Sequence, residues 1–300
     1  MAGNDALREF LRSRRARVDP ADVGLPAGPG TRRVPGLRRE ELARLAAVSV
    51  DYYVRLEQGR ARNVSPEVLE AVAAALRLDE HERAHLFDLA RPDRARQPLS
   101  APPPQRVRPG VRRLLDTLPT PAFVVGRRLD VLATNAMTRA LLCDFDALPP
   151  RERNHARWVF LDPTARERYV DWPAIARDNV AALRMDAGRW PDDPELSALV
   201  GELSVKSPEF AGWWAAHDVL RQSHGSKRYR HPVVGDLTVS YEALPVPDAD
   251  EQTLFVYTVE PGSPSERALA LLASWAAEGP AGEVPGRGVE GEGGARPRNA

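Results

Sequence analysis

Apolar residues recur at helical spacing throughout residues 1–90. The pairs Ala6-Leu7 and Phe10-Leu11 predict a first helix that ends before Asp19-Pro20. After a Pro- and Gly-rich stretch, further helices are predicted over residues 37–46, 50–57, 66–76 and the stretch that follows Asp79. Residues suited to helix ends stand between them, with N-caps at Ser49, Ser65 (ahead of Pro66) and Asp79, and a stop at Gly59. The N-terminal part is therefore predicted to be an all-α domain of five helices.

Strand patterns lie at both ends of a helical middle in the rest of the chain. Short apolar runs predict strands at residues 121–125, 130–133, 227–231, 236–243 and 253–260. Leu237, Val239 and Tyr241 alternate with polar residues, whereas residues 254–257 are uniformly apolar and predict a central strand. Helical patterns occupy residues 111–118, 135–142, 165–216 with proline breaks, and 264–277. This order predicts a single α+β sheet domain.

Proline and glycine divide the chain into its predicted parts. Residues 91–109 hold six prolines in nineteen positions, which predicts a stiff linker. Residues 279–300 hold seven glycines and three prolines and almost no apolar residues, which predicts a disordered tail. The predicted domains are therefore residues 1–90 and 110–278.

The formal net charge of zero hides an uneven distribution. Residues 1–115 hold 22 Lys and Arg against 15 Asp and Glu, a net charge of +7, and the remainder carries −7. A basic domain joined to an acidic one is typical of a DNA-binding module with a second function. Two domains whose charges differ for no functional reason are the alternative.

Other features narrow the class of protein. The single cysteine, Cys143, excludes a disulfide framework and a thiolate zinc site, and it lies beside Asp144, which disfavours a thiolate. No apolar run is long enough to span a membrane and no secretory signal is present, so we expect a cytoplasmic protein.

Catalytic and metal-binding patterns are also lacking. His217, His224 and His231 are spaced by seven residues but straddle a helix end, a loop and a strand, so we expect no metal site. Ser263 lacks the context of a nucleophile elbow, and no Gly-rich phosphate loop is present. We therefore expect no enzymatic activity and no cofactor.

The strongest motif is RREELARLAAVSVDYYVRLEQGR at residues 38–60. One predicted helix ends at Ala46, a short turn follows, and a second helix begins after Ser49. Ala43 is small where two helices must approach closely, and Val48 is apolar where the turn packs inward. Such a pair can place its second helix in the major groove of DNA. An ordinary helical hairpin is the alternative.

This segment resembles the XRE, or phage-repressor-like, helix-turn-helix family, with Glu57-Gln58-Gly59 matching its Glu-x-Gly ending. Its flanks, VGLPAGPGTRRVPGLRREELA, are similar to MmyB-like transcriptional regulators of actinobacteria. Further pieces of the second domain resemble the sensor domain of that family, including residues 121–124, 131–135, 160–163, 201–204, 207–210, 231–235 and 261–264. The resemblance covers residues 5–275. It implies a lambda-repressor-like domain and a PAS-like domain that can hold a fatty-acid-like ligand.

Candidate DNA contacts follow from the motif. They are Arg38, Arg39, Ser49, Val50, Asp51, Tyr52, Arg55, Arg60 and Arg62. Arg55 is suited to guanine or to phosphate, and Tyr52 to phosphate or a thymine methyl group. Arg38, Arg60 and Arg62 are placed for phosphates. The role of Arg39 comes from the resemblance.

Two acidic residues and one loop remain ambiguous. Asp51 either accepts a hydrogen bond from cytosine or caps its helix. Glu57 is expected to be structural, paired with an arginine of the first helix such as Arg14. Residues 19–36, with Arg32-Arg33, form either a basic arm on DNA or only a longer loop.

The ligand that the resemblance implies needs an apolar pocket. Candidate lining residues are Phe123, Val125, Leu132, Trp190, Phe210, Trp214 and Phe255. Taken individually, each fits plain core better, and only the resemblance makes it a pocket candidate. The resulting hypothesis is a ligand-sensing regulator that binds double-stranded DNA as a homodimer. The alternatives are a C-terminal domain that serves only dimerisation or protein interaction, and an enzyme with a regulatory N-terminus.

Overall fold

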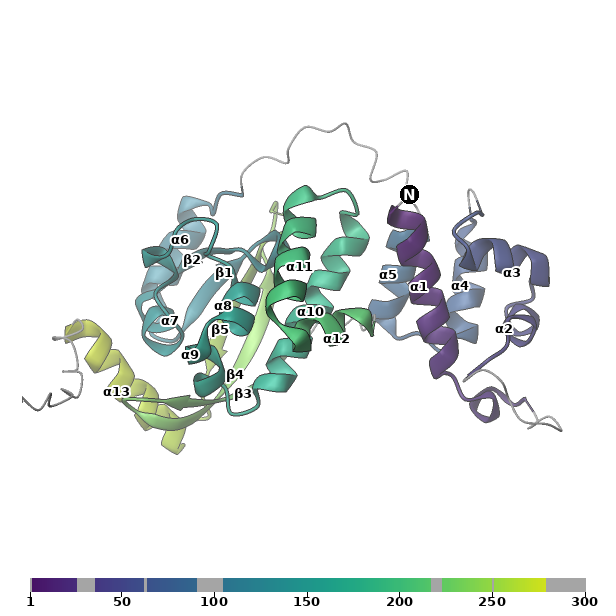
Figure 1. Ribbon diagram of the computed structural model, residues 1–300. Coiled ribbons are helices and arrows are strands. Elements are labelled where there is room, and N and C mark those ends of the chain that lie inside the picture. Colours follow the sequence, from purple (N-terminus) through teal and green to yellow (C-terminus); the bar gives the residue numbers. More distant parts are fainter. Residues whose placement is uncertain are drawn as a thin grey trace, which may run out of the picture.

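The computed structural model describes residues 2–25, 36–61, 64–90, 105–216, 223–249 and 251–278. Helical and α+β parts follow one another along the chain, as expected (Figure 1). Among the candidates named above, Arg32, Arg33, Arg62, His217 and the tail 279–300 lie outside the described residues. In the described part of the chain, no helix has the length and apolar character needed to cross a membrane.

The N-terminal part contains the five predicted helices. They are α1 (Ala2–Arg17), α2 (Arg39–Leu45), α3 (Val50–Glu57), α4 (Pro66–Ala75) and α5 (Glu80–Ala90), with a 3-10 turn at Pro20–Val23. The predicted N-caps are confirmed. Ser49 Oγ accepts from the Tyr52 amide at 3.1 Å, Ser65 Oγ from Val68, and Asp79 Oδ1 from the Glu82 amide at 2.8 Å.

The core of this part is formed by one apolar stripe from each helix. Its fully buried members include Phe10, Leu11, Leu42, Tyr53, Leu56, Leu69, Val72 and Leu86. Gly36 fixes how the chain returns from the loop to α2, because its φ is +74° and an added Cβ would lie 2.2 Å from the carbonyl oxygen of Arg15. Only glycine fits such a close left-handed approach. The loop therefore closes directly onto α1.

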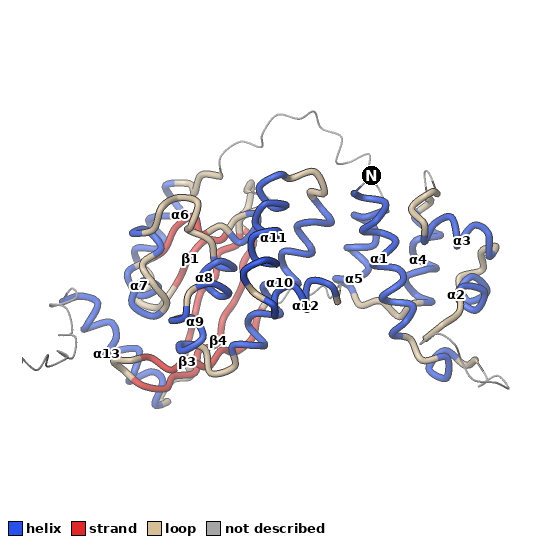
Figure 2. Tube along the Cα trace, in the orientation of Figure 1, coloured by secondary structure: helices blue, strands red, loops and turns tan. Residues whose placement is uncertain are grey.

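The second part is built on a five-stranded antiparallel sheet. Its strands are β1 (Ala122–Val125), β2 (Val131–Thr134), β3 (His224–His231), β4 (Gly235–Pro245) and β5 (Thr253–Thr258). Their order is β2-β1-β5-β4-β3, so β5, which holds the apolar residues 254–257, is central, as the sequence predicted. Figure 2 draws the strands of this sheet in red, among the helices of the second part. The register pairs Phe123 with Phe255 and Tyr241 with Tyr257, which places these rings near one another. The α+β class is confirmed.

Helices cover both faces of this sheet. They are α6 (Pro109–Thr117), α7 (Ala136–Leu141), α8 (His155–Leu161), α9 (Pro163–Arg168), α10 (Trp172–Arg189), α11 (Pro194–Lys206), α12 (Pro208–Ala215) and α13 (Pro264–Glu278). One face packs with α7 to α12 and α13 in the larger core, and the other packs against α6 in a smaller core. Short 3-10 turns follow β1 (η3, Arg127–Leu129) and α7 (η4, Phe145–Ala147).

The two parts touch through a small number of helices. α5 packs against α10, and α10 to α12 lie between the sheet and the N-terminal helices (Figure 1). The end of the proline-rich stretch also contacts the second part, because Gln105 accepts from the Arg127 amide and the Arg106 carbonyl accepts from Gln252. The last residues of the predicted linker thus pack on the sheet domain.

Candidate DNA-binding face and ligand cavity

The helix-turn-helix is closed by a tight turn at residues 46–49. Ala47 adopts a left-handed conformation with a φ of 53°, and the Val48 amide donates to the Ala43 carbonyl at 2.9 Å. Ala43 is fully buried, which allows α2 and α3 to approach closely. The local sequence thus sets the angle at which α3 leaves the turn.

Buried Glu57 fixes α3 against two other helices. Its carboxylate accepts from Arg15 of α1, where both N···O distances are 3.0 Å, and from Arg39 of α2. The prediction that Glu57 is structural agrees with this geometry, but Arg14 as its partner was wrong. Arg14 pairs with Glu82 at 3.2 Å instead. Neighbouring helical residues point about 100° apart, so only one of these two arginines can face α3.

The N-terminal half of α3 is the most exposed part of the motif. Ser49, Val50, Asp51 and Arg55 are exposed and Tyr52 is half-buried. Arg55 Nε lies 3.4 Å from Asp51 Oδ2, and its guanidinium lies over the Tyr52 ring at 5.9 Å. These side chains form one surface that can meet a base pair.

Arginines flank this surface on both sides. Arg38 and Arg60 are exposed, and the Arg39 side chain is 48% exposed although its guanidinium also holds Glu57. We call the set 38, 39, 49–52, 55 and 60 the α3 face. It combines groups suited to bases with groups suited to phosphates.

A cavity of about 160 Å³ lies between the sheet and α10. Four predicted pocket residues line it together: Phe123, Val125, Trp190 and Phe255. The remaining three candidates do not.

The positions of those three residues explain their absence from the cavity. Leu132 packs in the smaller core on the α6 side of the sheet, whereas the preceding residue, Val131, packs in the larger core. Phe210 is fully buried in the core against Phe160. Trp214 stacks on Phe210 and carries the Arg184 guanidinium over its ring at 3.7 Å.

Polar residues that the sequence analysis did not select also line the cavity. They are His155, Asp178, Asn179, Lys227 and Tyr241, among others. The sequence contains a pattern that could have identified Lys227 as a lining residue. It is one of two lysines in the chain, and it lies two residues from Tyr229 in a strand, so both point to the same face.

The Lys227 ammonium lies inside a group of aromatic rings. Its Nζ lies 4.6 Å from the Tyr241 ring, 5.6 Å from the Tyr257 ring and 6.0 Å from the Phe255 ring, and it donates to the Tyr257 hydroxyl at 3.4 Å. No carboxylate oxygen of the described residues lies within 4.0 Å of it. The cavity therefore contains a cation that has no acidic partner among the residues the structure describes.

His155 also lines the cavity and is buried. Its Nδ1 donates to Asn179 Oδ1 at 2.8 Å, an orientation fixed because the Asn179 amide nitrogen donates to the Ile175 carbonyl. Nε2 then accepts from the Tyr169 hydroxyl at 3.3 Å. Burial, helped by the charge of Lys227, lowers the pKa of His155 to about 4, so the ring is neutral at pH 7.

Asp178 faces the same cavity from α10. Burial raises the pKa of its carboxyl group, although the positive charge of Lys227 acts in the opposite direction. Burial therefore disfavours charge of either sign on His155 and Asp178, whereas the Lys227 ammonium favours a negative charge near it. Such an environment suits an anionic group on a bound molecule.

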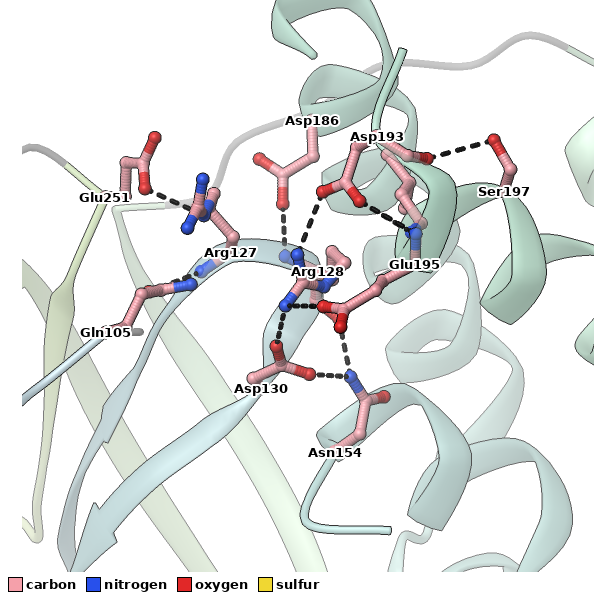
Figure 3. Close-up of polar contacts among 11 residues, drawn as sticks. Gln105, Arg127, Arg128, Asp130, Asn154, Asp186, Asp193, Glu195, Ser197 and Glu251 are labelled. Carbon is pink, nitrogen blue, oxygen red and sulfur yellow. Dashed lines mark hydrogen bonds and ion pairs between the residues drawn. The ribbon is translucent and has the colours of Figure 1, made fainter. Parts of the chain in front are cut away.

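The η3 turn holds one edge of the cavity in place (Figure 3). Arg128 adopts a left-handed backbone and its guanidinium contacts Asp130 at 2.8 Å, Asp193 at 2.9 Å and Glu195 at 2.7 Å. Its amide donates to Asp186 of α10 at 2.7 Å. Arg127 pairs with Glu251 at 2.9 Å. These contacts connect β1, the end of α10 and the start of β5.

Comparison with known proteins assigns both parts of the chain. Residues 107–272 match the model of the MmyB-like transcription regulator ligand binding domain, and residues 6–86 match a helix-turn-helix domain. No curated protein matches the chain. Both matching families are domains of regulators and not enzyme families.

Proposed function

Because the chain belongs to the family of MmyB-like transcription regulators, we propose that it binds a specific operator through the α3 face and responds to a lipid-like carboxylic acid. A helix-turn-helix joined to a ligand-binding domain of this family makes it a ligand-sensing transcription regulator. The operator contacts and the class of ligand are the proposed parts.

On the DNA side, α3 enters the major groove with Val50, Tyr52 and Arg55 toward base edges. Arg38, Arg39 and Arg60, together with Arg62, hold the phosphates on either side. The basic charge of this half of the chain supports this assignment. Footprinting on DNA upstream of its own gene tests the proposal, and protection no different from that of random DNA would reject it.

On the ligand side, the single observation that carries the proposal is the unpaired Lys227 ammonium in an aromatic cavity. A carboxylate supplies the missing charge, and an alkyl chain supplies apolar contact with Phe123 and Phe255. The cavity volume of about 160 Å³ is below the roughly 300 Å³ at which drug-sized pockets begin. We therefore propose that a longer chain emerges beside Trp190, which is 38% exposed.

Binding of two molecules with the same chain tests the role of Lys227. Dodecanoic acid should bind the wild type at least about tenfold more tightly than dodecanol, because a charge-assisted hydrogen bond is added. In Lys227→Met that preference should disappear while dodecanol binding is kept. Isothermal titration calorimetry measures both, and equal affinities in the wild type would reject the proposed head group.

We also propose that the regulator acts as a homodimer. Helix-turn-helix dimers bind two half-sites one helical turn apart, which multiplies the contacts of each α3 face. Sedimentation of the protein with operator DNA gives the stoichiometry, and one chain per operator would reject a dimer.

A further inference from the structure

One segment of α10 belongs to both parts of the molecule. Met185 lines the cavity, yet it is only 6% exposed and packs in the hydrophobic core of the helix-turn-helix domain. One turn later, Arg189 also lines the cavity, and its Nε lies 3.6 Å from Asp88 of α5. We call residues 185–190 the α10 end segment.

Gly188 sets how closely this segment approaches α5. An added Cβ would lie 2.4 Å from the ring of His85, which is buried and contacts the Phe10 ring edge-on at 5.1 Å. That distance is too short for any side-chain atom, and the His85 ring is enclosed by core. The two domains therefore meet through a contact that a single methyl group disrupts.

The same segment is tied to the η3 turn on its other side. Asp186 lines the cavity and accepts from the Arg128 amide, and the adjacent Arg127 amide donates to Gln105 at 3.0 Å (Figure 3). Gln105 is the first described residue after the stretch that joins the two domains. The cavity edge, the domain contact and the end of the connecting stretch thus meet at one place.

We infer that the α10 end segment transmits ligand occupancy to the DNA-binding domain. Packed interiors have few voids, so a ligand that moves Met185 or Arg189 must also change their packing against α5. α5 packs on α1 and α4, which carry the helix-turn-helix. Transmission from the cavity to the DNA-binding domain rests on the proposed function, because it requires a ligand that fills the cavity.

Hydrogen–deuterium exchange on the full chain tests this coupling. Dodecanoic acid should change the exchange rate of α5 amides by at least about fivefold, the lower end of usual coupling between sites. Amides in the second half of α11, residues 200–206, serve as the internal reference, because only the first turn of that helix contacts Arg128 at the cavity edge. If the acid binds by calorimetry but α5 exchange is unchanged, the coupling is rejected and the proposed function stands.

A second arm needs no ligand. Ala243→Phe fills the cavity from β4, and Thr253→Leu fills it from the start of β5. Neither substitution changes a residue of α10. If no acid binds, the ligand class is wrong, and these variants alone decide the coupling. The coupling is supported if a variant changes the exchange rate of α5 amides while the α11 reference amides exchange as in the wild type. It is rejected if α5 exchange is unchanged in both variants.

Glycine variants locate the path. Gly188→Ala should raise α5 exchange and abolish its response to the acid or to Ala243→Phe. The matched control is Gly201→Ala on α11, where an added Cβ meets nothing within 4 Å, and it should leave the response intact. His85→Ala combined with Gly188→Ala restores the space and should recover the response. Equal behaviour of the two glycine variants would overturn the assignment of this segment.

Discussion

At the scale of single residues, Arg55 is the side chain of the α3 face that we propose to read a base. Asp51 and Tyr52 already hold its guanidinium in the free protein. Fewer rotamers are lost when a held side chain binds, which lowers the cost of association. The same carboxylate partly offsets the positive charge of Arg55, so we expect Asp51 to weaken the attraction of Arg55 for DNA, while Ser49 and not Asp51 is the N-cap of α3.

Arg55→Ala should therefore remove discrimination between operator and random DNA at one base pair. We expect a loss of about 1–3 kcal/mol in operator binding, with non-specific binding much less affected. Fluorescence anisotropy with both duplexes measures this, and Arg83→Ala on α5 is the control. Undiminished discrimination would show that α3 is not the reading helix.

His155 gives the second domain a predictable dependence on pH. Its pKa is about 4 when folded and 6.5 ordinarily, so the unfolded chain binds more protons between these values. Stability is then complete above pH 6.5 and falls as the pH falls toward 4, by up to about 3 kcal/mol from this group. Asp178, whose pKa is raised, acts in the opposite direction at the acidic end.

His155→Gln should remove most of that loss. Urea unfolding at several pH values measures it, and tryptophan fluorescence is a selective probe because all six tryptophans lie between residues 158 and 275. An unchanged pH dependence in the variant would mean that another group governs it.

At the scale of helices, Glu57 joins α1, α2 and α3. Glu57→Ala leaves Arg15 buried without its partner, and breaking a buried pair costs about 3–5 kcal/mol. The exposed pair of Glu70 with Arg83 is the matched control, since solvent screens such a pair and Glu70→Ala should cost far less than Glu57→Ala. Far-UV circular dichroism reports on the helices of both domains and tryptophan fluorescence on the second domain alone, so a loss of dichroism without a matching change in fluorescence reports on this domain. Equal losses in the two variants would contradict the structural role of Glu57.

Element prediction from the sequence worked where the signal is local. Caps such as Ser49, Ser65 and Asp79, and the alternation in β4, depend on neighbouring residues and were recovered. Partners across the fold were not, as the exchange of Arg14 for Arg15 illustrates. The side that a helical residue faces depends on the rotation of the helix about its own axis. The sequence pattern predicts that rotation only to within one residue, or about 100°.

The cavity was the least predictable feature for a related reason. Apolarity alone cannot separate a lining residue such as Phe255 from a core residue such as Phe210. Polar lining residues came from elements distant in sequence, with Asn179 on α10 and Lys227 on β3. Only the fold brings these groups together.

At the scale of the whole molecule, the charge separation predicts a strong dependence of DNA binding on salt. Each phosphate contact releases counterions, so the logarithm of affinity should fall linearly with the logarithm of salt concentration. Arg38→Gln and Arg60→Gln should each reduce the slope by about 1, on operator and random DNA alike. Arg113→Gln, on α6 of the other domain, should leave it unchanged. Equal slopes in all variants would place the phosphate contacts elsewhere.

The order of strands in the sheet has a consequence for how the protein is made. β5 is central and pairs with both β1 and β4, yet it is the last strand to be synthesised. The β1–β2 hairpin cannot pair with β5 until most of the domain has been synthesised. Such non-local pairing folds slowly. The N-terminal helices face no such delay, since domains fold as units during synthesis. A nascent chain can therefore fold its helix-turn-helix before the sheet domain is complete, so we expect the proposed reading helix to form before the proposed ligand cavity.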